Sequence, residues 1–221
     1  MSYGFLLTGM GIGVLSWISA EKKWKWAVYL TKPAVILLFL AWLWQNDLLG
    51  GSMLWFCLGL VFSLAGDILL MLPVNLFIPG LVAFFVAQVL YLIGFNLSVT
   101  SISVPVLIVA LIFLGGAQII YRRLVQSLRE HKQEKLKLPI AFYTTAISLM
   151  AVSAMFTLAN PAWNTLHAVI ATCGAVLFVI SDSLLAWNKF VNAIPHAPAL
   201  IKATYHLGQM GIILGVALHF Y

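Results

Sequence analysis

Two aspartates occur in matching contexts within otherwise apolar stretches of this sequence. Asp67 and Asp182 each follow a small residue, lie eight positions after a glycine (Gly59 and Gly174), and precede a pair of leucines after one intervening residue. An unpaired ionisable group at the centre of a membrane costs at least ~2.5–3.5 kcal/mol, so such a residue faces a bundle interior or a wet cavity. Two carboxyls in one cavity can perform acid–base chemistry, because one can stay protonated while the other stays ionised.

Further polar side chains lie at a similar depth in other apolar stretches. Lys202, Tyr205, His206 and Gln209 follow the spacing i, i+3, i+4, i+7, which forms one stripe on a helix. With the polar residues of three other stretches, the candidate binding residues are Lys32, Gln88, Tyr143, Lys202, Tyr205, His206 and Gln209. We expect these side chains and the two aspartates to form one polar pocket.

Structural interpretations of the same residues stay open. Lys32 and Lys202 are long enough to extend their ammonium groups to a membrane interface. Each aspartate can be one half of an ion pair that fixes helix packing, and His206 can be a hydrogen-bonded packing residue. Nothing points to a metal or another cofactor, since the sequence has no HExxH motif and its two cysteines lie apart in apolar segments.

The composition identifies the class of protein that must position these residues. The chain has 221 residues, of which 63% are hydrophobic and 8% charged, and its mean hydropathy is +1.04. Soluble domains carry roughly 25% charged residues. The composition therefore excludes a soluble enzyme, a DNA-binding domain and a disordered protein, and it predicts a polytopic membrane protein.

Eight apolar stretches are long enough to cross a bilayer, which takes roughly 20 residues each. Their continuous apolar character predicts an all-α fold rather than a β-barrel, whose strands alternate. The short connections leave no room for a second domain, so residues 1–221 form a single transmembrane domain. The predicted spans are residues 3–20, 26–44, 51–72, 76–97, 103–121, 139–159, 163–187 and 198–219.

The basic residues outside the spans predict the orientation of the chain. Three lie between the first two spans, six between the fifth and sixth, and one, Lys189, between the last two, whereas the alternate connections have none. By the positive-inside rule, we expect a cell (inner) membrane protein with both termini on the outer side and the pocket facing the cytoplasm. The net charge of +6 thus reflects topology rather than a nucleic-acid partner. We expect the helix of the fifth span to continue into residues 121–137.

The two aspartate segments belong to a predicted internal repeat. Gln88 and Gly94 correspond to Gln209 and Gly215, with an offset that grows from 115 to 121 residues. Two halves of four spans each, approximately 1–100 and 101–221, keep the same orientation. They form a parallel repeat about an axis along the membrane normal.

Several of these segments resemble the lysoplasmalogenase (YhhN-like) family of membrane hydrolases. The similarity covers Thr31-Lys32-Pro33, the segment from Phe62 to Leu70, the segment from Gly174 to Phe190, the Tyr205 and Gln209 pair, and Tyr143 after Pro139. The resemblance implies eight spans and cleavage of the vinyl-ether bond of lysoplasmalogens to a fatty aldehyde and a glycerophospho-alcohol, without a metal. The chain departs from the family pattern at Gln88, where a histidine is usual, so a proton-transfer role at that position is in doubt.

Vinyl-ether hydrolysis suits two buried acids. The β-carbon must be protonated to give an oxocarbenium ion, which water then attacks, as in glycoside hydrolysis. We assign Asp67 as the general acid and Asp182, between two serines, as the ionised partner; Lys32 and Lys202 would hold the substrate phosphate. A lysophospholipid and the surrounding membrane lipids are the expected partners. The rival interpretations are a proton-coupled small-molecule transporter that uses the same aspartates and a scaffold protein without chemistry.

Overall fold

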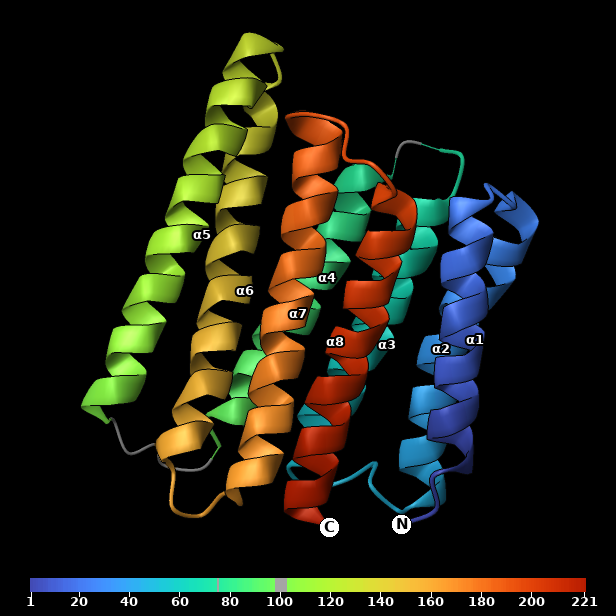
Figure 1. Cartoon of the computed structure of the whole chain (residues 1–221), viewed down its shortest axis with the longest axis vertical. Helices are drawn as coiled ribbons and strands as arrows, with labels where there is room; N and C mark the ends of the chain where they lie inside the picture. The colour runs from blue at the N-terminus through green and yellow to red at the C-terminus, as the bar shows by residue number, and fades with distance from the viewer. Residues whose placement is uncertain (75, 98–102) are drawn as a thin grey trace.

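A computed structural model of the chain describes residues 1–74, 76–97 and 103–221. Within these ranges the chain forms eight α-helices and no strand, so the all-α prediction is confirmed (Figure 1). The helices are α1 (Gly4–Glu21), α2 (Lys25–Gln45), α3 (Met53–Met71), α4 (Phe77–Phe95), α5 (Val104–Glu130), α6 (Lys137–Phe156), α7 (Thr165–Phe190) and α8 (Ala197–Phe220). They match the eight predicted stretches, and α5 continues nine residues beyond residue 121, as the sequence predicts.

Seven of these helices are long and apolar enough to cross a membrane, which makes the chain a polytopic membrane protein. Among the described helices α8 does not meet this criterion, although it has 24 residues. The helix carries the polar stripe, and many of its side chains are buried against neighbouring helices. Helix α8 runs alongside α7 and returns the chain to the end of the bundle where the N-terminus lies (Figure 1). It therefore crosses the bundle from one end to the other, as the other helices do.

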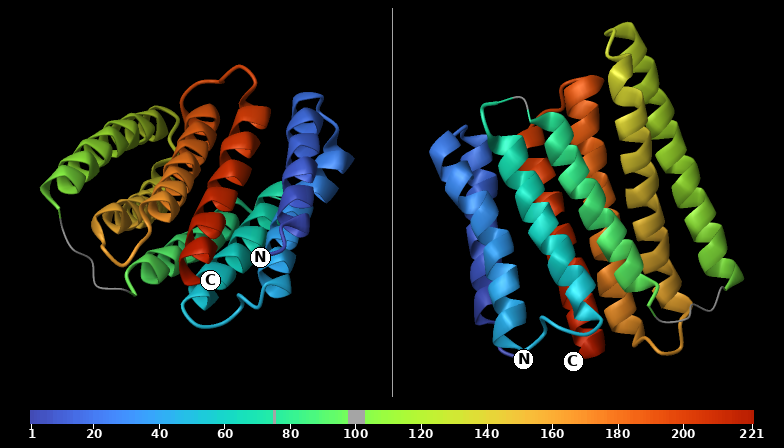
Figure 2. Two further views of the ribbon diagram at one scale, coloured as in Figure 1. Left: turned by 60° about the horizontal axis from the view of Figure 1, so that its bottom comes forward. Right: turned by 180° about the vertical axis from the view of Figure 1, so that it is seen from behind.

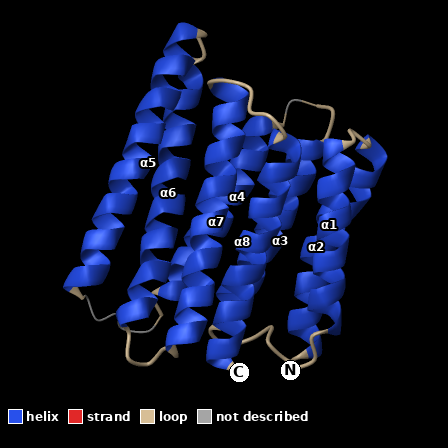
Figure 3. Cartoon of the chain, viewed as in Figure 1, coloured by secondary structure: helices blue, strands red, loops and turns tan. Residues whose placement is uncertain are grey.

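Helices that follow one another in the chain are antiparallel and form one bundle (Figure 2). Helix α1 packs against α2 and α8, α3 against α4, α4 against α6, and α7 against α8. Helix α5 lies at one side of the bundle and contacts α6 and α7 (Figure 3). The core between the helices is filled by large side chains such as Phe39, Trp42, Phe56, Met150 and Phe178, all inaccessible to solvent.

The connections α1–α2, α5–α6 and α7–α8 meet at one end of the bundle, whereas both termini lie at the other (Figure 1). We call the first of these the basic end, because these three connections and their flanking helix turns hold the ten basic residues counted above. The C-terminal part of α5 and the start of α6 extend beyond the other helices there (Figure 1). All basic loops therefore lie on one side, as the positive-inside argument requires.

Close packing between helices depends on glycines in both aspartate segments. A Cβ atom on Gly174 of α7 would lie 2.3 Å from the backbone nitrogen of Ile212 in α8. A Cβ atom on Gly59 of α3 would lie 2.2 Å from the ring of Tyr91 in α4. The two matching glycines thus both permit contact with the next helix, once with backbone and once with an aromatic ring. The internal repeat itself stays a prediction, and its boundary near residue 100 lies outside the described residues.

We expect Gly174→Ala to destabilise the bundle. The added methyl group would meet the backbone of α8, which cannot rotate away as a side chain can, and such overpacking costs about 1–3 kcal/mol. The matched control is Gly115→Ala in α5, whose Cβ atom would have no neighbour within 4 Å. Thermal unfolding in detergent should show a lower midpoint for Gly174→Ala only; equal midpoints for the two variants would contradict the close approach of α7 and α8.

Candidate active site

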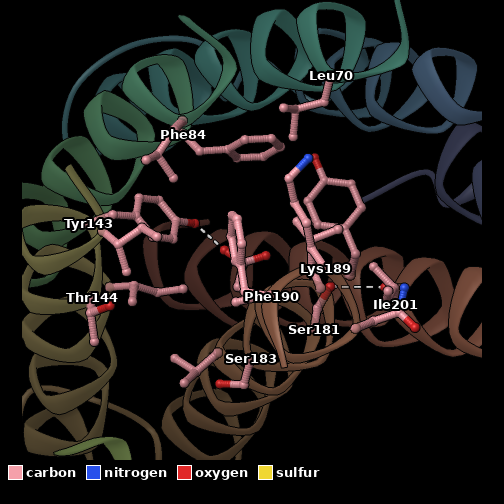
Figure 4. A pocket seen from close by; sticks show the side chains of 18 of the residues that line it. Leu70, Phe84, Tyr143, Thr144, Ser181, Ser183, Lys189, Phe190 and Ile201 are labelled. Atoms are coloured by element: carbon pink, nitrogen blue, oxygen red, sulfur yellow. Dashed lines mark hydrogen bonds between the residues drawn. The ribbon is translucent and has the colours of Figure 1, made fainter. Parts of the chain in front are cut away.

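A cavity of about 370 Å³ lies inside the half of the bundle nearest the basic end. Helices α2 to α8 all contribute to its lining. Six of the nine predicted site residues line it: Lys32, Asp67, Tyr143, Asp182, Lys202 and Tyr205. Figure 4 shows Tyr143 and Thr144 of α6 facing Ser181 and Ser183 of α7 across this space, with Phe84 of α4 closing one side. The fold therefore brings the two aspartates and four of their predicted partners to one cavity.

Asp67 is completely buried and is held from two sides. The ammonium of Lys32 lies 2.6 Å from carboxylate Oδ1, and only 15% of the lysine side chain is exposed. The hydroxyl of Tyr205 donates a hydrogen bond of 2.9 Å to Oδ2. Both partners stabilise a negative charge on Asp67 and so offset part of the cost of burying that charge.

A chain of buried hydrogen bonds leads to the same carboxylate. The hydroxyl of Tyr91 donates to Oε1 of Gln209 at 2.7 Å. The amide nitrogen of Gln209 donates to the hydroxyl of Tyr205 at 3.4 Å, and Tyr205 donates to Asp67. Each donor points toward Asp67, which is the final acceptor of the chain. An ionised acceptor at this end strengthens every bond before it.

Asp182 has different surroundings. It is half-buried, it accepts a hydrogen bond from the hydroxyl of Tyr143, and no cation of the described residues lies within ion-pair distance. The hydroxyl of Ser181 was expected to favour a charged Asp182, but it donates instead to the carbonyl of Ile201 at 2.9 Å (Figure 4). Ser181 therefore does not stabilise a negative charge on Asp182, contrary to the expectation from sequence.

Two lysines at the cavity make no ion pair within the described part of the chain. Lys202 is half-buried, and its ammonium contacts the carbonyl of Pro198 at 3.3 Å. Lys189 is exposed and lies over the ring of Phe77, 4.5 Å from its centroid. Sequence reasoning counted Lys189 only as a loop charge. Its position seven residues after Asp182, on the same face of one helix, was the available signal.

The other three predicted site residues lie outside the lining of the cavity. His206 accepts a hydrogen bond of 3.0 Å from the indole of Trp17 in α1, and its other ring nitrogen has no partner in the described residues. Gln209 belongs to the hydrogen-bond chain described above. Gln88 lies beside Tyr143, with neither amide atom in hydrogen-bond geometry. A direct contact between these three residues and a substrate stays a prediction.

No group of three His, Cys, Asp or Glu side chains suited to a metal ion occurs in residues 1–74, 76–97 or 103–221. This observation fits the sequence, which suggests no ligand set. Catalysis without a metal nevertheless stays a prediction.

The helical bundle and the two aspartates at its cavity define a polytopic membrane protein with a polar intramembrane cavity. A model of the YhhN family matches residues 27–216, and the chain belongs to this family.

Curated relatives agree with this assignment. The human protein named lysoplasmalogenase TMEM86B is 31% identical over 198 residues, which cover 90% of this chain and 78% of that protein. Bovine lysoplasmalogenase TMEM86A is 31% identical over 159 residues, 71% of this chain and 62% of that protein. An uncharacterized membrane protein YhhN of Escherichia coli O157:H7 is 28% identical over 206 residues, 90% of this chain and 92% of that protein. No solved structure matches the chain.

Proposed function

We propose that the chain is a membrane hydrolase that cleaves the vinyl-ether bond of lysoplasmalogens to a fatty aldehyde and a glycerophospho-alcohol. The observation that carries this proposal is the pair of carboxyls, from α3 and α7, that line one cavity with unlike partners. The names of the relatives support the same substrate class.

The partners of the two acids suggest the reverse of the roles expected from sequence. Asp67 is paired with Lys32 and accepts from Tyr205, so it suits the ionised group that offsets a positive charge on the oxocarbenium ion. Asp182 has only the Tyr143 hydroxyl, so it is the better general acid. Its proton would pass to the β-carbon of the vinyl ether.

The remaining steps can use the same two groups. The Asp182 carboxylate left by the first step accepts a proton from the water that attacks the α-carbon, as the acid–base residue of glycosidases does. Asp182 then gives this proton to the glycerol oxygen and takes up the proton of the hemiacetal hydroxyl while the hemiacetal collapses to aldehyde and alcohol. One water is consumed and the enzyme regains its starting state, so atoms and protons balance.

The unpaired lysines provide a place for the substrate phosphate. Lys32 was expected to share this role, but its ammonium is engaged by Asp67. Lys202 and Lys189 line the same cavity without an acidic partner within the described residues. A lysophospholipid bound with its phosphate at Lys202 and Lys189 would place its vinyl-ether bond, which joins the chain to the glycerol, near the two aspartates.

We expect Lys202→Met to raise KM about tenfold with little change in kcat. The variant loses a charge-assisted hydrogen bond to the phosphate that stabilises the bound substrate and the transition state equally. Lys189→Met should act in the same direction. The matched control is Lys25→Met, an exposed lysine at the start of α2 that does not line the cavity. Steady-state aldehyde release would measure the effect; a fall in kcat at constant KM would instead assign Lys202 to the chemistry.

The orientation predicted from sequence completes the proposal. Eight crossings, with both termini outside, would place the basic end and the cavity in the cytoplasmic half of the membrane. The location of all basic loops at the end nearest the cavity supports this orientation.

The deciding experiment is a test of aldehyde release by purified protein in detergent. We expect aldehyde from a lysoplasmalogen, and none from the matched ester-linked lysophospholipid, which has no vinyl-ether carbon to protonate. Failure to release aldehyde, together with substrate flux into protein-containing liposomes, would favour the transporter interpretation instead.

A further inference from the structure

Helix α5 has fully buried side chains only near its two ends. Its buried residues are Ala110 toward the start and Leu124, Ser127 and Leu128 toward the end. Between residues 111 and 123 no side chain is fully buried, and five are half-buried, among them Phe113 and Leu114, which pack against the core. The side chains in this middle part of α5 therefore leave space between α5 and α6.

A second hollow, of about 270 Å³, occupies this unsealed seam between α5 and α6. Its lining includes Leu114 and Leu149, which do not reach the first cavity. Four residues line both spaces: Ala117, Tyr121, Thr144 and Ser148. The seam thus shares a wall with the cavity that holds the two aspartates, and its exposed residues, such as Thr145, lie at the exterior of the bundle.

The opposite side of the cavity has a different character. A third hollow, of about 160 Å³, lies toward the basic end and shares Asn188, Lys189 and Phe190 with the cavity. Its other polar residues include His131 and Gln133. Polar and basic walls suit a phosphate-containing headgroup. Among the described residues the seam has no charged side chain, and its leucines, alanines and tyrosine ring, together with Gln118, Ser148 and two threonines, suit a hydrocarbon chain better than a headgroup.

We infer that the seam between α5 and α6 holds the hydrocarbon chain of the substrate. This inference rests on the proposed function. The vinyl-ether carbon that begins the chain must lie beside the aspartates, and the headgroup must lie toward Lys189 and Lys202. The chain then has to leave the cavity sideways between two helices, and the seam lies between α5 and α6 at the depth of Thr144 and Ser148, which also line the cavity.

The position of α5 supports one fatty chain as the occupant. The exposed residues of α5 are largely apolar, and this is the least buried of the seven membrane-spanning candidates. A chain in the seam keeps its far end in the bilayer while its reactive end meets the acids, so no methylene group has to enter water. Leu114 and Leu149 would then contact the chain beyond the first few carbons.

The test is a bulky residue placed in the outer part of the seam. Thr145 of α6 is exposed, lines the seam and not the cavity, and donates a hydrogen bond to the carbonyl four residues before it. We expect Thr145→Trp to reduce kcat/KM about tenfold or more for a hexadecenyl lysoplasmalogen. Turnover of a butenyl analogue, whose chain ends before Thr145, should stay unchanged.

The matched control is Thr8→Trp in α1. Thr8 is also exposed and donates to the carbonyl four residues before it, but it lines none of the three hollows. The inference predicts no chain-length effect for this variant. Equal losses for both chain lengths in Thr145→Trp, or no loss for either, would overturn it.

A second measurement is independent of turnover. A lysophospholipid with a diazirine at the end of its chain should, on illumination, label peptides of α5 and α6 in competition with unlabelled lysophospholipid. Labelling that does not respond to competitor would overturn the inference. If wild-type protein releases no aldehyde from either chain length, the proposed function fails, and the labelling result still decides whether a lipid chain occupies the seam.

Discussion

Replacement of Asp182 by Asn is expected to reduce aldehyde release by about 10²-fold or more, the usual contribution of acid–base catalysis. The amide keeps the size of the carboxyl but has no proton to give to the vinyl ether. Asp67→Asn should cause a loss of similar size, because it removes the negative charge that stabilises the oxocarbenium ion. Both variants should be measured as purified protein with confirmed folding.

The two variants should differ in their dependence on pH. Wild-type kcat/KM should be bell-shaped against pH, since one carboxyl must be protonated and the other ionised. If Asp182 is the acid, the residual activity of Asp182→Asn should lose the decline at high pH. Asp67→Asn should lose the decline at low pH. The opposite pattern would return the acid's role to Asp67, as expected from sequence.

Asp47→Asn is the matched control for both variants. Asp47 is exposed in the connection between α2 and α3, at the end of the bundle away from the cavity. The substitution should leave both the rate and its pH dependence unchanged. Near-normal aldehyde release from folded Asp67→Asn or Asp182→Asn would refute a two-acid mechanism.

The extent to which sequence predicts this structure depends on the kind of contact. Hydropathy and length predict seven of the described helices to within a few residues, because a bilayer of fixed thickness determines both, whereas α5 runs nine residues beyond its predicted span. Depth along a helix is also readable from sequence. The aspartates, four and eight residues before the ends of α3 and α7, therefore meet at one cavity as expected.

The sequence does not predict how each helix is rotated about its own axis or which helices pack against it. The stripe on α8 predicts one common face, but α8 is surrounded by α1, α2, α3 and α7. Tyr205 therefore contacts Asp67 of α3, whereas the adjacent His206 contacts Trp17 of α1. The open seam beside α5 has no sequence signal either, because apolar residues that face lipid and those that face a helix look alike.

The sequence does not say which cation, if any, pairs with Asp67. We expect that removing its partner, Lys32, strongly lowers the stability of the protein. Lys32→Met leaves a fully buried carboxylate without its cation. Breaking a buried pair in this way typically costs about 3–5 kcal/mol of unfolding free energy. Thermal or denaturant unfolding in detergent should therefore show a clear loss of stability, while Lys25→Met, at an exposed lysine of the same helix, should show none.

A double variant separates the structural role of this pair from its chemical role. Lys32→Met with Asp67→Leu removes both charges, and replacing a buried pair by apolar residues of similar volume is often neutral or stabilising. The double variant should therefore recover the stability lost in Lys32→Met. If the pair only fixed the packing of α2 against α3, aldehyde release would recover as well. We expect stable protein without activity, because the charge on Asp67 is needed when the oxocarbenium ion forms, and only a catalytic role requires that charge once the fold is restored.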